Sequence, residues 1–185
     1  MDQLLLDTTQ ILASTRDVSR VLRRLARSFV PALADFCLIH LVDRHHLRCI
    51  ASAHSTREGR RLVRTLAGNT PIHRNDPLST AAHVVRTGRV QIRSDITSDT
   101  DVPGRSRGGG ALRRLAPQSA MVIPLIGRDR ALGAITLCYS ESGRRYTAQH
   151  MRSAKQLARL VTDYLSNEKP AAPPVRRLPP LRARV

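Results

Sequence analysis

Three cysteines and seven histidines are the side chains of this 185-residue chain that could bind a metal, act as nucleophiles or change redox state. The cysteines are Cys37, Cys49 and Cys138. They are odd in number and widely spaced, which fits neither a disulfide framework nor a CxxC zinc or redox motif. We therefore expect reduced thiols and no metal site built on a cysteine pair.

One pairing of these side chains follows from a predicted β-hairpin. Apolar runs at 36–42 and 47–53 flank the polar residues 43–46, which is typical of two strands joined by a turn. If the turn is centred between residues 44 and 45, His40 lies opposite Cys49 on one face. Cys138, on a neighbouring strand, could complete a cluster for zinc or a redox switch. The alternative is that both cysteines are small buried hydrophobes, and the sequence leaves both interpretations open.

The formal net charge of +17 raises the question of a nucleic-acid partner. Nearly all of the charge comes from arginines spread over every segment, with no interleaved aromatics of the kind that stack on bases. We expect weak polyanion binding at low salt but no specific nucleic-acid binding. In the predicted helix 56–66, four arginines share one face and could either admit an anionic ligand or form a solvated surface: Arg57, Arg60, Arg61 and Arg64.

Periodicity and turn residues predict the elements that position these side chains. An apolar repeat of four and three predicts an N-terminal helical region over 3–30 with a bend at 14–17, and Thr147 begins a C-terminal helix over 147–166. Further helices are predicted at 56–66, 77–87 and 111–116, strands at 90–96, 119–126 and 132–140, and a loop at 97–110. These elements form one domain, residues 1–167. The Pro- and Arg-rich residues 168–185 are predicted to be a disordered tail.

Several short segments resemble the GAF domain family when taken in order. They are 21–26 (VLRRLA), 34–37 (ADFC), 41–43 (LVD), 85–89 (VRTGR), 95–96 (DI), 119–125 (SAMVIPL) and 132–137 (LGAITL). Each is weak alone, but together they extend from about residue 4 to residue 165. The chain therefore resembles the GAF modules of bacterial signalling proteins.

The resemblance implies an α+β, GAF-like fold related to PAS domains. Its central antiparallel sheet has about five to six strands, the terminal helices pack on one face, and a ligand pocket lies on the other. If Ile135, Leu137 and Tyr139 face the helices, residues of the opposite parity face the pocket. The expected ligand-binding residues are Leu38, His40, Ser52, Asp95, Ser119 and Thr136.

The function implied by the resemblance is that of a sensory module that binds a small ligand or a partner protein in signal transduction. We expect no enzymatic activity and no catalytic residue, because the loop cysteines of the reductase members of the family are absent. Neither covalent bilin attachment nor the cyclic-nucleotide signature is indicated, and the ligand and any cofactor are not predicted. Without an output domain of its own, the protein would signal through a homodimer of its terminal helices or a separate partner. The alternatives are a ligand-free dimerisation module and a basic nucleic-acid-associated protein.

The predicted location is the cytoplasm. The first ten residues include Asp2 and Asp7 and lack the basic region of a signal peptide. No apolar run approaches the ~18 residues that a membrane-spanning helix needs. We therefore expect no membrane partner.

Overall fold

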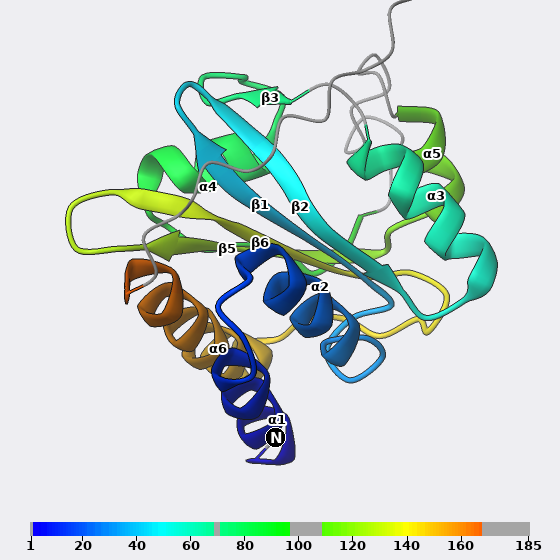
Figure 1. Cartoon of the computed structure of the whole chain (residues 1–185). Coiled ribbons are helices and arrows are strands. Elements are labelled where there is room, and N and C mark those ends of the chain that lie inside the picture. The colour runs from blue at the N-terminus through cyan, green and yellow to red at the C-terminus, as the bar shows by residue number, and fades with distance from the viewer. Residues whose placement is uncertain (1, 69–70, 97–108, 168–185) are drawn as a thin grey trace, which may run out of the picture.

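A six-stranded antiparallel sheet in the order β3-β2-β1-β6-β5-β4 forms the centre of the molecule (Figure 1). The computed structural model describes residues 2–68, 71–96 and 109–167. The strands are β1 (Phe36–Asp43), β2 (His46–His54), β3 (Ile72–His73), β4 (Gln91–Arg93), β5 (Ser119–Ile126) and β6 (Ala131–Tyr139). The helices are α1 (Asp2–Ala13), α2 (Val18–Ser28), α3 (Arg57–Ala67), α4 (Thr80–Thr87), α5 (Gly109–Leu115) and α6 (Ala148–Asn167). The predicted tail at 168–185 lies outside the described residues, as does most of the predicted loop at 97–110.

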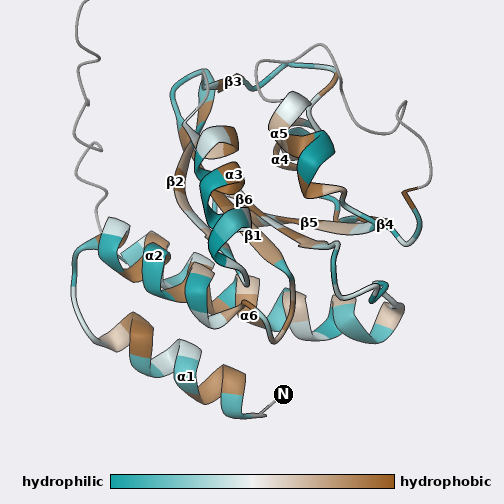
Figure 2. Ribbon diagram, turned by 90° about the vertical axis from the view of Figure 1, so that its right-hand side faces the viewer, coloured by the Kyte–Doolittle hydropathy of each residue, from teal (hydrophilic) through white to brown (hydrophobic). Residues whose placement is uncertain are grey.

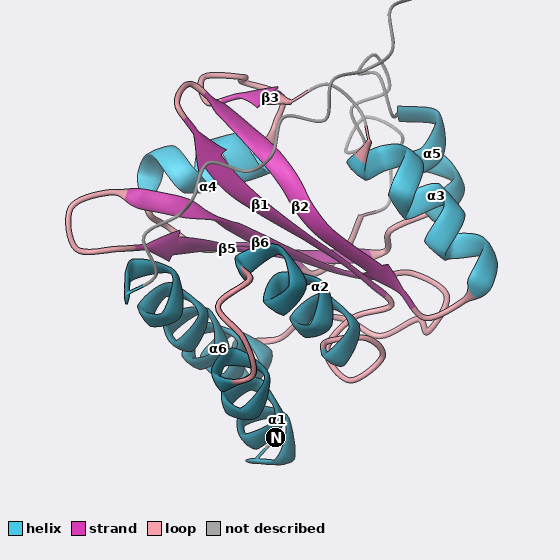
Figure 3. Ribbon diagram, in the orientation of Figure 1, coloured by secondary structure: helices cyan, strands magenta, loops and turns pink. Residues whose placement is uncertain are grey.

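Helices cover the sheet on both faces, and the two faces differ (Figure 3). On one face, α1, α2 and α6 bury the larger core against side chains such as Ile39, Ile135 and Leu137. On the other, α3, α4 and α5 pack on a smaller set that includes Phe36, Leu38 and Val122. Figure 2 shows hydrophobic residues along the central strands, while hydrophilic residues alternate with them on α2 and α3. The predicted α+β fold, with its terminal helices together on one face, is confirmed.

The bend predicted in the N-terminal helical region separates α1 from α2. Asp17 is extended and its carboxylate accepts a hydrogen bond from the backbone N–H of Arg20, which caps the start of α2. The helix then buries Val21, Leu22 and Leu25, which share one face at the spacing of the predicted repeat. No helix in the described part of the chain is long and apolar enough to cross a membrane.

The β1–β2 hairpin has the predicted register over its first half. Asp43 pairs with His46, and His40 pairs with Cys49. A bulge between Ile39 and His40 then shifts the register by one residue. The two-residue strand β3 was not predicted, because so short a run carries no alternation.

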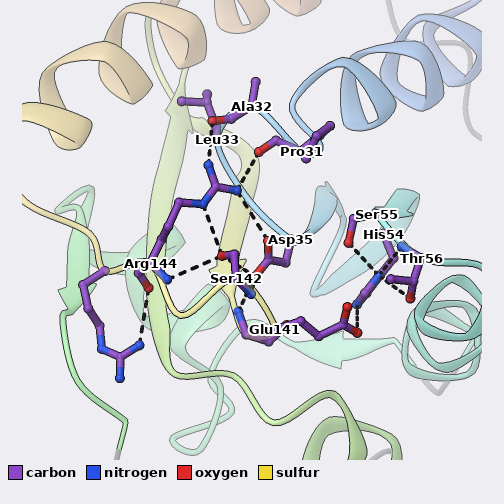
Figure 4. A network of polar contacts seen from close by, with 12 residues as sticks. Pro31, Ala32, Leu33, Asp35, His54, Ser55, Thr56, Glu141, Ser142 and Arg144 are labelled. Carbon is purple, nitrogen blue, oxygen red and sulfur yellow. Dashed lines mark hydrogen bonds and ion pairs between the residues drawn. The ribbon is translucent and has the colours of Figure 1, made fainter.

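A buried carboxylate ties the start of β1 to the chain that follows β6 (Figure 4). Asp35 is 3% exposed, and its Oδ2 accepts hydrogen bonds from the N–H of Ser140 at 2.7 Å and from the N–H and hydroxyl of Ser142 at 2.9 and 2.7 Å. The Arg144 guanidinium lies 3.4 Å from Oδ1 and also donates to the carbonyl of Pro31. Burial opposes ionisation, but these donors outweigh it and hold the pKa of Asp35 below its ordinary 3.8.

We predict that Asp35→Asn lowers the free energy of unfolding at pH 7 by about 2–4 kcal/mol, because an amide cannot accept from all of these donors. A carboxylate with a depressed pKa stabilises the fold above its unfolded pKa and loses this contribution as the pH falls through its folded pKa. Urea unfolding of both proteins should therefore show a gap at pH 7 that narrows below about pH 3.8. If the two proteins differ in free energy of unfolding as much below pH 3.8 as at pH 7, this role of Asp35 is contradicted.

Candidate functional site

A cavity of about 250 Å³ lies between the sheet and the helices α3, α4 and α5. Its floor comes from alternate residues of the central strands, because side chains of one parity point to the same face. These residues include Phe36, Leu38, His40, Ala120, Val122, Thr136 and Cys138. Most of the lining is apolar, with a few polar groups, as in small-molecule sites.

The structure brings three of the six predicted site residues together. Leu38 and Thr136 are direct partners across β1 and β6, and His40 lies two residues further along β1. All three line the cavity. His40 and Thr136 are thus diagonal neighbours on one face, a relation that places Cβ atoms about 7–8 Å apart in antiparallel sheets.

The other three predicted residues lie elsewhere. Ser52 lines a different hollow, along the outer edge of β2. Asp95 is 63% exposed and lies 3.7 Å from the guanidinium of Arg145. Ser119 is fully buried on the other face, where its hydroxyl donates to the carbonyl of Arg93 and accepts from the N–H of Tyr146. Ser119 points away from the cavity because alternate residues of a strand share a face. Along β5 it therefore lies with Met121 and Ile123, in the core beneath α1, α2 and α6.

His40 is the polar group with the most unusual environment in the cavity. Burial lowers its pKa from 6.5 to about 4, so the ring is neutral at pH 7. Its Nδ1 is buried and has no hydrogen-bond partner within the described residues. An unpaired buried acceptor is less rare than an unpaired buried N–H, which favours the tautomer with the proton on Nε2. The ring can then donate one hydrogen bond to an acceptor in the cavity.

The side of the cavity opposite the sheet is formed by leucines that the sequence analysis did not name as site residues. Leu66 of α3, Leu78 before α4 and Leu112 of α5 line the space. Leu78 is 63% exposed, which is high for a leucine. The sequence predicted these helices, but the direction of each inward side chain depends on tertiary packing. The arginines of α3 that were considered as a gate do not line this cavity.

The possible thiol and imidazole cluster is not formed. His40 and Cys49 pair as expected, but Cys138 pairs with Phe36, four residues from His40 along β1. Four residues of strand span about 13 Å, too far for ligands of one metal ion. Within the described residues no three His, Cys, Asp or Glu side chains are grouped to hold a metal.

Burial also suppresses the reactivity of the cysteines. It raises the pKa of Cys49 and of Cys138 to about 12, and that of Cys37 well above its ordinary 9. The reactive form of cysteine is the thiolate, so these thiols are poor nucleophiles at neutral pH. The interpretation of both strand cysteines as small buried side chains fits this environment.

A central antiparallel sheet, terminal helices on one face and a cavity beneath the helices of the other define the class of this α+β domain. The chain belongs to the GAF domain family, whose model matches residues 15–166. GAF domains are typically sensory or regulatory parts of signalling proteins. A comparison with curated proteins found no match.

Solved structures share the fold at low sequence identity. The GAF domain of a phosphoenolpyruvate-protein phosphotransferase from Acinetobacter has a TM-score of 0.64 at 13% identity, over 88% of this chain and 90% of that one. A segment of a methyl-accepting chemotaxis protein has a TM-score of 0.64 at 16% identity, over 85% and 93%. The fRMsr of Staphylococcus aureus in its reduced form has a TM-score of 0.62 at 11% identity, over 88% and 94%.

We predict that His40→Phe reduces the acid sensitivity of the protein. A histidine whose folded pKa is lowered binds its proton mainly in the unfolded state, so stability falls as the pH drops from 6.5 towards about 4. The full pKa shift of His40 corresponds to a loss of about 3 kcal/mol in the free energy of unfolding at low pH. Urea midpoints of wild type and variant between pH 7.5 and 4.5 check this, and an equal loss in both would contradict it. Burial also lowers the pKa of His54. The variant should therefore keep a smaller loss of stability as the pH falls.

Proposed function

We propose that this protein is a non-enzymatic GAF sensor that acts in the cytoplasm and binds a small ligand in the cavity between the sheet and α3–α5. The observation that carries the proposal is the pairing of an apolar cavity of about 250 Å³ with the buried, neutral ring of His40. Sites for drug-sized ligands commonly measure about 300–1,000 Å³, so this one suits a molecule the size of a single ring.

The lining defines the chemistry of the ligand. Leu38, Val122 and other apolar residues would cover most of its surface. His40 would donate a hydrogen bond from Nε2, and the hydroxyl of Thr136 can donate or accept. We infer a largely apolar molecule that carries one hydrogen-bond acceptor. Residues 91 to 96 and α5 border the cavity, so a bound ligand would stabilise the segments that close over it.

The proposal excludes catalysis because the cavity offers no activated nucleophile. Cys138 is the thiol that lines it, and burial raises the pKa of that thiol to about 12. His40 could not act as a base for this thiol, since Cys138 lies at the level of Phe36 on the sheet.

We predict that single-ring probes stabilise the protein in an order set by their polar group. Benzamide and acetophenone are neutral and offer an acceptor to His40, whereas toluene fills the cavity without one, so both should raise the melting temperature more than toluene does. Ala120→Leu, which places a larger side chain in the cavity, should abolish all three shifts. Thr136→Val is the control for cavity volume: it removes only a hydroxyl, so the shift with toluene, which makes no hydrogen bond, should remain. Equal shifts in wild type and Ala120→Leu would contradict the site.

The second candidate is a ligand-free dimerisation module. α1 projects from the body of the molecule beyond α2 and α6 (Figure 1), and its Leu6 is 58% exposed. A helix from a second copy would cover this side chain. A homodimer that Leu6→Lys converts to a monomer, together with no response to any ring probe, would favour this candidate.

A further inference from the structure

The second hollow, of about 700 Å³, follows the outer edge of β2. We call it the β2 groove, and it is lined by the β2 segment from Cys49 to His54, by the side of α2 and by the side of α3. The two helices pack on opposite faces of β2. In Figure 1 both slant in the same direction as the strand.

Within the described residues, most of β2 has no strand on its outer side. β3 covers β2 only at His46 and Leu47. From Arg48 onward, β2 has a strand partner on the β1 side alone within the described residues. The side chains of Ala51, Ser52 and Ala53 are small, so little side-chain bulk stands beside this part of the strand. Such an edge accepts an additional strand.

Four arginines border the groove, two from each helix. Arg23 and Arg27 belong to α2, Arg60 and Arg64 belong to α3, and all four are exposed. Among the described residues, no Asp or Glu lines the groove and none of the four guanidinium groups makes an ion pair or hydrogen bond. The edge is therefore flanked on both faces by positive charge that this part of the chain does not neutralise.

The spacing of these arginines matches the repeat of a strand. Each pair is four residues apart on a helix, which corresponds to a rise of about 6 Å. Side chains on one face of a strand recur every ~6.6–6.8 Å. A strand added to β2 would present alternate side chains to α2 and to α3. Four consecutive acidic residues would thus meet both pairs of arginines.

We propose that the β2 groove binds an extended acidic segment of a partner protein, which pairs with β2 as an additional strand. This goes beyond the proposed ligand-binding function, because the groove is separate from the cavity that contains His40. A second copy of this chain does not fit, since its net charge of +17 opposes its approach to a basic edge. The backbone supplies pairing without sequence preference, and the arginines select for acidic residues.

The test is fluorescence polarisation with a fluorescein-labelled peptide, Thr-Val-Glu-Asp-Glu-Asp-Val-Thr, in about 0.15 M salt. The variant Arg60→Ala/Arg64→Ala should weaken binding at least about fivefold, since two charge contacts are lost. Arg57→Ala/Arg61→Ala is the matched control, with the same helix, spacing and loss of charge, but its two side chains do not line the groove. The control should bind like the wild type.

A second comparison separates strand pairing from simple charge attraction. The same peptide with N-methyl groups on its four acidic residues keeps every charge but cannot donate to β2, so its binding should be lost. Three results would overturn the proposal: no binding of the parent peptide, equal weakening by the two arginine pairs, and equal binding of the N-methylated peptide. Competition by single-stranded DNA of equal charge at equal concentration would also overturn it and favour a nucleic-acid partner.

Discussion

The buried residue Asp35 holds the centre of the sheet together. Its N–H donates to the carbonyl of Cys138, its own carbonyl accepts from the N–H of Ser55, and its carboxylate binds the chain beyond β6. One residue thereby joins β1 to both of its neighbouring strands. Because β1 and β6 are buried on both faces, a slip of one residue would turn every core side chain to the wrong layer. The interactions of Asp35 oppose such a slip.

The β1–β6 register decides what each face of the sheet can do. With Leu38 opposite Thr136, one parity builds the core beneath α2 and α6, and the other builds the floor of the cavity. His40 then lies in an apolar setting that keeps it neutral and ready to donate a single hydrogen bond. The outer edge of β2 is separate from both layers, so ligand binding and partner binding can occupy different surfaces of one domain.

Much of this arrangement was predictable from the sequence, and the misses have physical causes. Periodicity located the helices, and the turn between residues 44 and 45 set the pairing of His40 with Cys49. The bulge beyond His40 depends on backbone geometry that the sequence pattern does not encode. It places Ser52 opposite Leu38, but β2 lies one strand nearer the edge of the sheet, where Ser52 lines the outer hollow instead of the cavity. Asp95 was assigned to the ligand site by resemblance alone. In the structure its carboxylate is exposed and lies near Arg145, outside the cavity. The arginines of the groove come from two helices far apart in sequence, so only the fold brings them together.

The central claim is that the cavity above His40 and Thr136 binds a small molecule. Native mass spectrometry tests it most directly, after wild type and Ala120→Leu are incubated with the small-molecule fraction of a lysate from the source cells. The account predicts one added mass on the wild type that denaturation removes and that the variant lacks. The same added mass on both proteins, or none on either, would contradict it.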